Sequence, residues 1–460
     1  HIIRILEIAE EKILFAPHHV SHVLSAIPYQ RTNLDDTALH FVFDAVGDGI
    51  CSSIFSGAPT DLEILHQNQH PHSIGFFYSA VTEFCGFNTN EGEFKLMALA
   101  AYGKPIYADF ILNNLIKFST PSIQLNLDWF NFHKSVTSSY SSLFQEKFGA
   151  PANQNDLLFN AERFQAFADI AASAQNVTEK IICEIISWGI RETGIQNITV
   201  SGGVAQNCVA MYRASFLPEV KNFTVPPSPG DSGAAIGAAN FATIIGGKNP
   251  IKIDTIAFGN FLPEPNANIF ADLFETVDNS DSYASAAKLL DNGEIICTFV
   301  GGNEIGPRAL GHRSIICSGS NREVIQSLNT IIKKREAFRP LAPVMKSSTA
   351  QKYFQLNQNS IHNYRWMGLT AFAKQELPDQ YSRCLHIDGS ARLQIAEKGF
   401  GPIFDILQLV KDEILLNTSF NVSGDPMVGD YIDCFVNMQR MGLNYLLTDT
   451  GLFRIKASVA

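Results

Sequence analysis

The stretch NITVSGGVAQNCVAMYRAS, residues 197–215, predicts a buried strand that turns at two glycines and enters a helix. Directly before it, AERFQAFADIAASAQNVTEKIICEIISWGIRETG (161–194) has the apolar spacing of a long amphipathic helix that ends at Gly194. Earlier in the chain, LHFVFDAVGDGICSSIFSG (39–57) predicts a strand, a glycine turn and a returning strand. Strands and helices that alternate in this way predict an α/β fold.

The second half of the chain continues this alternation. A helix is expected at 283–291, a buried strand at EIICTFVGG (294–302), and a strand running into a turn at DEILLNTSFNVSGDP (412–426). Because a single core rarely grows beyond about 250–300 residues, a chain of 460 residues should form at least two domains. The sequence AFGNFLPEPNANI, around residues 256–268, loses periodicity and is the expected linker.

Composition indicates a protein of the cytoplasm. The eight cysteines are scattered without a CxxC pair, which favours reduced thiols over disulfides or a zinc ribbon. No apolar run is long enough to span a bilayer, and the acidic start HIIRILEIAEEK does not resemble a signal peptide. The net charge of −11 disfavours an extended nucleic-acid surface.

One segment departs from this acidic composition. Between GPRALGHRS (306–314) and LNTIIKKREAFRPLAP (328–343) the chain carries seven basic residues against two acidic ones. Guanidinium groups bind phosphate bidentately and stay charged at any relevant pH. The cluster therefore predicts a site for a small phosphorylated ligand, and its alternative is a solvated charged face. The basic residues are Arg308, Arg313, Arg322, Lys333, Lys334, Arg335 and Arg339.

Metal-binding residue types gather in the first half. If APHHVSHVLSA (16–26) is helical, His18 and His22 project from one face and suit a single ion. Asp44 ends a predicted strand, and Asp231 begins a predicted helix, where its simpler role is an N-cap. Two imidazoles with carboxylates suit Fe(II), Mn(II) or Zn(II). The glycine turns at Ser201–Asn207 and Gly230–Gly233 could cradle a nucleotide at helix N-termini, or simply be tight packing turns.

Nine segments, in order, resemble the O-carbamoyltransferases of the NodU/CmcH family, which tailor antibiotics, nodulation factors and related natural products. They are HHVSH, FDAVGDG, SIGFFYSAVTEFCGFNTNEGEFKLMALAAYG, SGGVAQNCV, PGDSGAAIGAA, NEIGPRALGHRSI, LNTIIKKREAFRPLAP, HIDGSARLQ and LLNTSFNVSGDPMV. The resemblance implies a duplicated actin/hexokinase-like (ASKHA) metal-binding domain at 1–262 and a YrdC-like α/β domain at 263–460. Two departures from the family's pattern are noted. Ala98, Ala101 and Met211 differ from the residues expected beside these motifs, and the family is expected to have a further stretch with a first strand ahead of HHVSH.

The resemblance also implies a two-step reaction. The YrdC-like domain would make carbamoyl-adenylate from carbamoyl phosphate and ATP with Mg²⁺, and the first domain would transfer the carbamoyl group to a hydroxyl. Iron, or another divalent metal, would be bound by His18, His22, Asp44 and Asp231. The adenylate-forming pocket would contain Arg308, Arg313, Lys333, Arg339, Arg392, Asn417 and Ser419. Gly202, Gly203 and Asn207 would meet the adenylate in the first domain, and His19 is a candidate general base against the simpler role of a structural histidine.

Other proteins share parts of this pattern. A tRNA threonylcarbamoylation enzyme would need a basic tRNA-binding surface, which a pI of 5.6 opposes. A hydrogenase-maturation carbamoyl carrier would need an acylphosphatase domain and zinc-finger cysteines. A sugar kinase would not need HHVSH, and a non-catalytic nucleotide-binding relative would not need KKREAFRP. The acceptor is expected to be a hydroxyl-bearing small molecule or saccharide that contacts 104–160, and a homodimer without nucleic-acid or membrane partners is expected.

Overall fold

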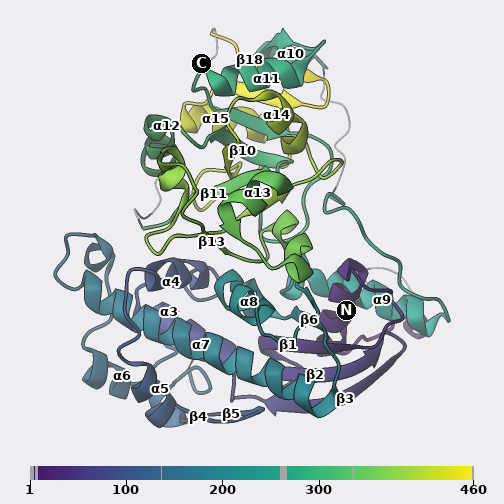
Figure 1. Cartoon of the computed structure of the whole chain (residues 1–460), viewed down its shortest axis with the longest axis vertical. Coiled ribbons are helices and arrows are strands. Elements are labelled where there is room, and N and C mark those ends of the chain that lie inside the picture. The colour runs from purple at the N-terminus through teal and green to yellow at the C-terminus, as the bar shows by residue number, and fades with distance from the viewer. Residues whose placement is uncertain are drawn as a thin grey trace.

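The structure is a computed structural model that describes residues 5, 9–135, 137–259, 267–333, 336 and 338–457. Two halves lie one above the other, with residues up to 245 in the lower part of Figure 1 and residues from 267 in the upper part. The expected domain boundary at 262/263 lies outside the described residues, as do Lys334 and Arg335 of the basic segment. In the described part of the chain, no helix is both long and apolar enough to cross a membrane.

The N-terminal half is built on a five-stranded sheet of order β3-β2-β1-β6-β7. The first three strands pair antiparallel, and β6 and β7 continue the sheet parallel to β1. These strands are β1 (Ala38–Gly47), β2 (Ile50–Ala58), β3 (Asp61–Gln69), β6 (Asn197–Ser201) and β7 (Asn222–Thr224), and a separate hairpin consists of β4 (Ile116–Ser119) and β5 (Ser122–Leu125). The described residues contain one such five-stranded sheet, so the duplication implied by the resemblance is not seen in them.

Helices cover both faces of this sheet because side chains alternate along β1. Phe41 packs with the core around the long helix α7, whereas Val42 packs with the helices α2 and α9. A strand buried on both faces has no solvent-exposed side, which explains why LHFVF is apolar except for His40, whose buried ring hydrogen-bonds to Thr199. The helices of this half are α2 (His18–Ala26), α3 (Ile74–Phe84), α4 (Glu93–Ala100), α5 (Ala108–Asn114), α6 (Ser142–Phe148), α7 (Phe164–Thr193), α8 (Cys208–Ser215) and α9 (Asp231–Ile245).

The C-terminal half is built on an eight-stranded, mostly antiparallel sheet of order β15-β11-β16-β10-β9-β17-β18-β8. Its strands are β8 (Phe274–Asp278), β9 (Ile296–Phe299), β10 (Arg313–Ser318), β11 (Ala342–Lys346), β15 (Gln394–Ala396), β16 (Ile414–Ser419), β17 (Tyr445–Thr448) and β18 (Gly451–Ile455). A small sheet contains β12 (Phe354–Gln355), β13 (Ala371–Ala373) and β14 (Ser390–Ala391). The helices are α10 (Ala267–Leu273), α11 (Ser282–Asp291), α12 (Arg322–Gln326), α13 (Ser347–Tyr353), α14 (Ile403–Leu409) and α15 (Tyr431–Met441).

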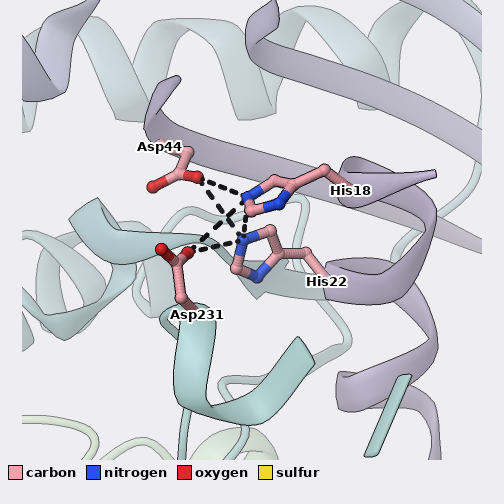
Figure 2. A group of neighbouring side chains, drawn as sticks. All are labelled: His18, His22, Asp44 and Asp231. Carbon is pink, nitrogen blue, oxygen red and sulfur yellow. Dashed lines mark hydrogen bonds and ion pairs between the residues drawn. The ribbon is translucent and has the colours of Figure 1, made fainter. Parts of the chain in front are cut away.

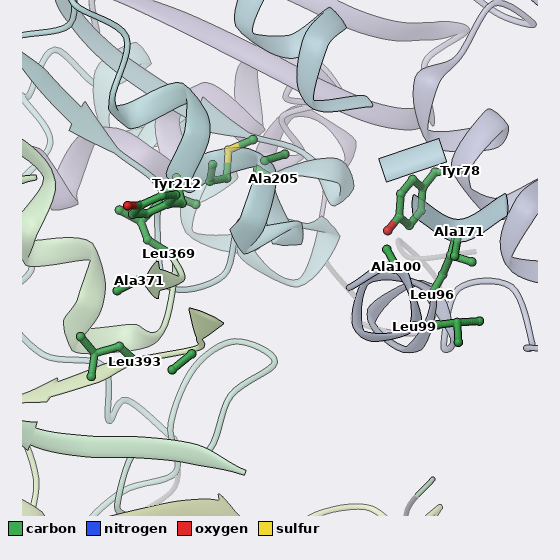
Figure 3. Packing of buried hydrophobic residues seen from close by; sticks show 14 of the residues in the cluster. Tyr78, Leu96, Leu99, Ala100, Ala171, Ala205, Tyr212, Leu369, Ala371 and Leu393 are labelled. Atoms are coloured by element: carbon green, nitrogen blue, oxygen red, sulfur yellow. The ribbon is translucent and has the colours of Figure 1, made fainter. Parts of the chain in front are cut away.

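The two halves share an apolar interface. Figure 3 shows Tyr212 of the N-terminal half beside Leu369 of the C-terminal half, within one hydrophobic cluster that includes residues of both. The Trp366 indole N–H donates to the Val225 carbonyl (2.8 Å), and the Asn363 side chain accepts from the Val225 N–H (2.8 Å). The two halves are therefore held together by apolar packing and by hydrogen bonds around Val225.

The helices and strands that were predicted from the sequence are present at the expected segments, among them α7, β6, α11 and β16. The helix α7 ends where Gly194 takes a left-handed conformation (φ 72°), and the β1–β2 turn contains Asp48 and Gly49 with positive φ. One local expectation is wrong, because Gly230 is the N-cap of α9. Asp231 is the first helical residue, and its carboxylate makes no capping bond.

Candidate active site between and beside the two halves

Four side chains converge near the C-terminal end of β1, the central strand of the N-terminal sheet (Figure 2). His18 and His22 extend from one face of α2, Asp44 from β1 and Asp231 from the start of α9. His18 Nε2 lies 3.0 Å from Asp44 Oδ2, 3.0 Å from His22 Nε2 and 3.6 Å from Asp231 Oδ1. His22 Nε2 lies 3.4 Å from each of the same carboxylate oxygens, and one ligand atom from every residue falls within 4.8 Å of the others.

Close helix packing brings these residues together. A Cβ on Gly237 of α9 would lie 1.7 Å from the Ser21 carbonyl of α2, so only glycine permits this crossing. A Cβ on Gly47 would lie 1.9 Å from the His18 ring. The start of α2 is held by Asp48, whose carboxylate accepts the backbone N–H of His18 (2.8 Å). Small residues at these positions therefore serve the site directly.

The glycine turn after β6 supports Asp44. The Gly203 N–H donates to Asp44 Oδ1 (3.1 Å), which leaves Oδ2 directed at the two imidazoles. Gly202 has a positive φ of 89°, and a Cβ there would lie 2.3 Å from the Phe43 carbonyl. In this structure, both glycines that were expected to meet an adenylate pack against β1.

The charges of the cluster suit a bound cation. Burial by itself would raise the pKa of Asp44, but hydrogen bonds from His18 and His22 outweigh it and lower that pKa. The bond to Asp44 raises the pKa of His18 against the opposing effect of burial. His18 Nε2 is close to Asp44, His22 and Asp231, and a single proton on this nitrogen can form a hydrogen bond to only one of them. A cation bound between the four residues would attract every one of these atoms. Ligands about 2.1 Å from one ion lie about 3.0–3.4 Å apart, close to the separations observed here. Two nitrogen and two oxygen donors fit Fe(II), Mn(II) or Zn(II).

His19 lies beside this cluster and points elsewhere. Its Nδ1 is 2.7 Å from Ser53 Oγ on β2, and the side chain is buried. Burial lowers the pKa of His19 to about 4. The contact with β2 explains a structural role for His19, and its role as a general base stays a prediction.

In the C-terminal half, a buried carboxylate shapes the loop that carries the first two arginines. Glu304 Oε1 accepts the backbone N–H groups of Leu310 (2.9 Å), His312 (2.7 Å) and Arg313 (3.1 Å). Glu304 was not among the residues predicted from the sequence, although it stands within NEIGPRALGHRSI. The loop also touches the N-terminal half, since a Cβ on Gly306 would lie 2.3 Å from the Pro227 carbonyl.

Those basic residues of the segment that the structure describes do not form one cluster. Arg313 is buried, and its guanidinium donates to the carbonyls of Val300 (3.1 Å), Gly301 (2.9 Å) and His312 (3.0 Å). It also lies 3.7 Å from the centre of the Phe299 ring. Arg313 therefore holds the backbone that surrounds the start of β10.

Lys333 and Ser419 are brought together. Lys333 Nζ donates to the Ser419 carbonyl (2.9 Å) and to Asn421 Oδ1 (2.9 Å). Two residues earlier in β16, Asn417 Nδ2 donates to the Ala309 carbonyl (2.9 Å). The end of β16 thus lies against the arginine loop, as a common pocket requires.

Arg339 and Arg392 line a cavity of about 300 Å³ between the two halves. The C-terminal half contributes these arginines, and α4, α7 and α8 of the N-terminal half contribute the facing wall. Glu336 joins the walls, since it pairs with Lys95 (2.7 Å) and with Arg339 (3.1 Å). Lys95 therefore faces the boundary between the halves.

The facing wall contains polar residues that were not predicted from the sequence. Gln175 and Glu179 lie one turn apart on α7, and Arg213 on α8 is near Glu179. Their signal was a pair of polar residues at helical spacing within the small-residue run AASAQNVTEK. Asn207 caps α8 and exchanges two hydrogen bonds with Gln175 (2.9 and 3.0 Å). Asn207 is therefore bonded directly to a side chain that lines the cavity.

Family profiles match both halves of the chain. The profile described as Carbamoyltransferase N-terminus matches residues 1–240, and that described as Carbamoyltransferase C-terminus matches residues 287–454. An uncharacterised protein of Synechocystis sp. is 32% identical over 475 residues, covering 95% of this chain and 75% of its own length. Nodulation protein NolO of Bradyrhizobium diazoefficiens is 26% identical over 450 residues, covering 95% and 78%. A solved structure of HypF from T. kodakarensis matches 37% of this chain and 21% of its own, with 20% identity and a TM-score of 0.29.

Proposed function

The chain belongs to the carbamoyltransferase family and is a carbamoyltransferase, and from this premise we propose a two-step reaction. The C-terminal half would form carbamoyl-adenylate from carbamoyl phosphate and ATP. The carbamoyl group would then pass to a hydroxyl of a natural-product or saccharide acceptor. The observation that carries this proposal is the pairing of a four-residue metal-ligand set with an arginine-lined cavity at the boundary of the halves.

Arg308 and Arg339 are suited to the phosphate groups of the substrates. Among the described residues, no carboxylate forms an ion pair with Arg308. Burial lowers the pKa of Arg308, and the charge of Arg339 acts in the same direction. Two guanidinium groups near each other repel, and a phosphate between them would relieve this repulsion. We propose that carbamoyl phosphate and the ATP phosphates supply this negative charge, with Mg²⁺ accompanying ATP.

The end of β16 is suited to the carbamoyl group. Asn417 Oδ1 is buried and accepts no hydrogen bond within the part of the chain that the structure describes. A buried amide oxygen without a donor is costly, and the NH₂ of a carbamoyl group would satisfy it. Ser419 and Lys333 lie at the same end of β16, where they would bind the carbonyl or α-phosphate oxygens. A closed pocket would also protect carbamate from water.

His18, His22, Asp44 and Asp231 would hold a divalent metal in the second step, and iron is our first choice. When bound, the ion would act as a Lewis acid toward the carbamoyl or phosphate oxygens. The Asp231 side chain is 76% exposed, whereas His22 and Asp44 are buried. Substrate would therefore approach from the side of Asp231, which lies next to the loop 225–230 contacted by the arginine loop.

The decisive experiment supplies the purified protein with ATP, Mg²⁺ and carbamoyl phosphate. We expect pyrophosphate release and a carbamoyl-adenylate mass, both dependent on carbamoyl phosphate. Binding of ATP without either product would contradict the proposed first step. A panel of hydroxyl-bearing acceptors, with ¹⁴C-carbamoyl phosphate as donor, would then identify the acceptor class.

A further inference from the structure

The cavity between the halves holds an acidic side chain with no role in the reaction described so far. Glu179 lies on α7, on the face that also presents Ala172, Gln175 and Asn176 to the cavity. Spacings of three, four and seven residues place these positions on one side of a helix. The side chain of Glu179 is 17% exposed, so its carboxylate reaches the cavity from a largely buried position.

A hydrogen-bond network holds this carboxylate in one orientation. Glu179 Oε1 accepts from Gln175 Nε2 (2.8 Å). The same amide nitrogen donates to Asn207 Oδ1 (3.0 Å), and Gln175 Oε1 accepts from Tyr78 (2.7 Å) and Asn207 (2.9 Å). All four hydrogen-bonding positions of the Gln175 amide are thus used, and the amide cannot turn without breaking several bonds. A base held in place by a further, fixed group is a recurring arrangement in sites where a side chain takes a proton.

The network also connects Glu179 with the metal-ligand cluster. Asn207 follows directly on the turn whose Gly203 N–H binds Asp44. The same short segment therefore positions Asp44 at one end and Gln175 at the other. On the opposite side, the cavity is lined by Arg339 and Arg392, whose positive charge suits a departing phosphate.

Burial of Glu179 favours proton uptake by its carboxylate. The hydrogen bond from Gln175 opposes this effect, and so does the charge of Arg213, whose Nε lies 3.7 Å from Oε2 and whose side chain is half exposed. Burial raises the pKa of Glu179 above its ordinary value, which makes it a stronger base than a surface carboxylate.

Two other groups are less suited to this role. His19 is buried against Ser53 and does not line the cavity. Asp388 lines the cavity, but its Oδ1 is used by the Ser390 N–H (2.9 Å) within a tight turn.

We infer that Glu179 is the general base of carbamoyl transfer, an inference that rests on the proposed function. The acceptor hydroxyl oxygen attacks the carbonyl carbon of carbamoyl-adenylate, and a new C–O bond forms. The hydroxyl proton moves to the Glu179 carboxylate. The bond between the carbonyl carbon and the phosphate oxygen breaks, and AMP leaves with the electron pair.

The test compares Glu179→Gln with Glu192→Gln, the same change at an exposed position of the same helix. Carbamoyl-adenylate formation is measured as single-turnover pyrophosphate release and as hydroxylamine-trapped N-hydroxyurea, because hydroxylamine needs no base. Transfer is measured as ¹⁴C-carbamate ester formed on glycerol and on N-acetylglucosamine. In Glu179→Gln we expect ester formation to fall by at least ~100-fold, with N-hydroxyurea formation unchanged. Formate should restore ester formation in Glu179→Ala and should have no effect on Glu192→Gln.

Each other outcome overturns the inference in a distinguishable way. Ester formation by Glu179→Gln within about threefold of the unsubstituted protein shows that another group takes the proton. Loss of pyrophosphate release together with ester formation assigns Glu179 to the first step. If the unsubstituted protein makes carbamoyl-adenylate but carbamoylates neither alcohol, the cavity does not admit hydroxyl acceptors. If the unsubstituted protein makes no carbamoyl-adenylate, the proposed function fails instead.

Discussion

Substitution of Gly47 by alanine should disable the metal-ligand cluster without unfolding the protein. The new Cβ would lie 1.9 Å from His18 Cδ2 and 2.6 Å from Nε2, whereas ordinary contacts begin at 3.4 Å. The ring must therefore shift by roughly 1.5 Å, far beyond the ~0.2 Å tolerance of metal–ligand distances. Because His18 is the first residue of α2 and its side chain is partly exposed, the ring has room to move.

We expect the affinity for Fe(II) or Zn(II) to fall by about 100-fold. Changes to the groups that orient a metal ligand lower metal affinity by about 10–100-fold, and this change displaces the ligand itself. The free energy of unfolding should change by only about 1–2 kcal/mol, because the clash is relieved by moving one side chain. Metal affinity would be measured by competition with a chromophoric chelator, and stability by urea denaturation of the metal-free protein.

Gly246→Ala is the matched control. Gly246 follows α9 at a negative φ, and its new Cβ would lie 3.4 Å from the nearest atoms. It should therefore leave metal affinity unchanged. The reasoning is refuted if folded Gly47→Ala binds metal within about threefold of the unsubstituted protein, because His18 would then not be a ligand in this geometry.

Four further predictions concern separate parts of the site and the interface. The double variant His18→Ala/His22→Ala should keep carbamoyl-phosphate-dependent ATP–pyrophosphate exchange and lose transfer to an acceptor; loss of exchange in a folded variant would contradict this division. Arg339→Ala should abolish that exchange while metal content measured by mass spectrometry stays unchanged, and surviving exchange would refute its phosphate role. Glu304→Gln replaces the charged acceptor of three backbone N–H groups and should lower the free energy of unfolding by roughly 1–3 kcal/mol in urea denaturation. Burial lowers the pKa of His362 to about 3, so between pH 6.5 and 3 only the unfolded state takes up a proton at this side chain. This difference should lower the free energy of unfolding by roughly 1.4 kcal/mol for each pH unit as pH falls, and His362→Gln should make the free energy of unfolding less dependent on pH.

Local structure followed from the order of residues along the chain. Gly194 ends α7 because glycine adopts the left-handed conformation at little cost. Gly49 does the same in the β1–β2 turn, next to Asp48, which also has a positive φ. The spacing of His18 and His22 directs both rings to one side of α2, which helical geometry alone dictates. The four residues of the candidate metal site could therefore be proposed from sequence with the help of family resemblance, and their role as ligands stays a prediction.

Contacts between distant segments were decided only by the tertiary structure. The basic segment was predicted as one cluster, but Arg313 bonds to the carbonyls around Gly301, whereas Arg339 lines the cavity against the N-terminal half. A charge pattern records how many cations are present and not which buried carbonyls compete for them. Likewise, Glu179 became visible only when packing set α7 opposite Arg339, because burial and hydrogen-bond partners depend on elements far apart in sequence.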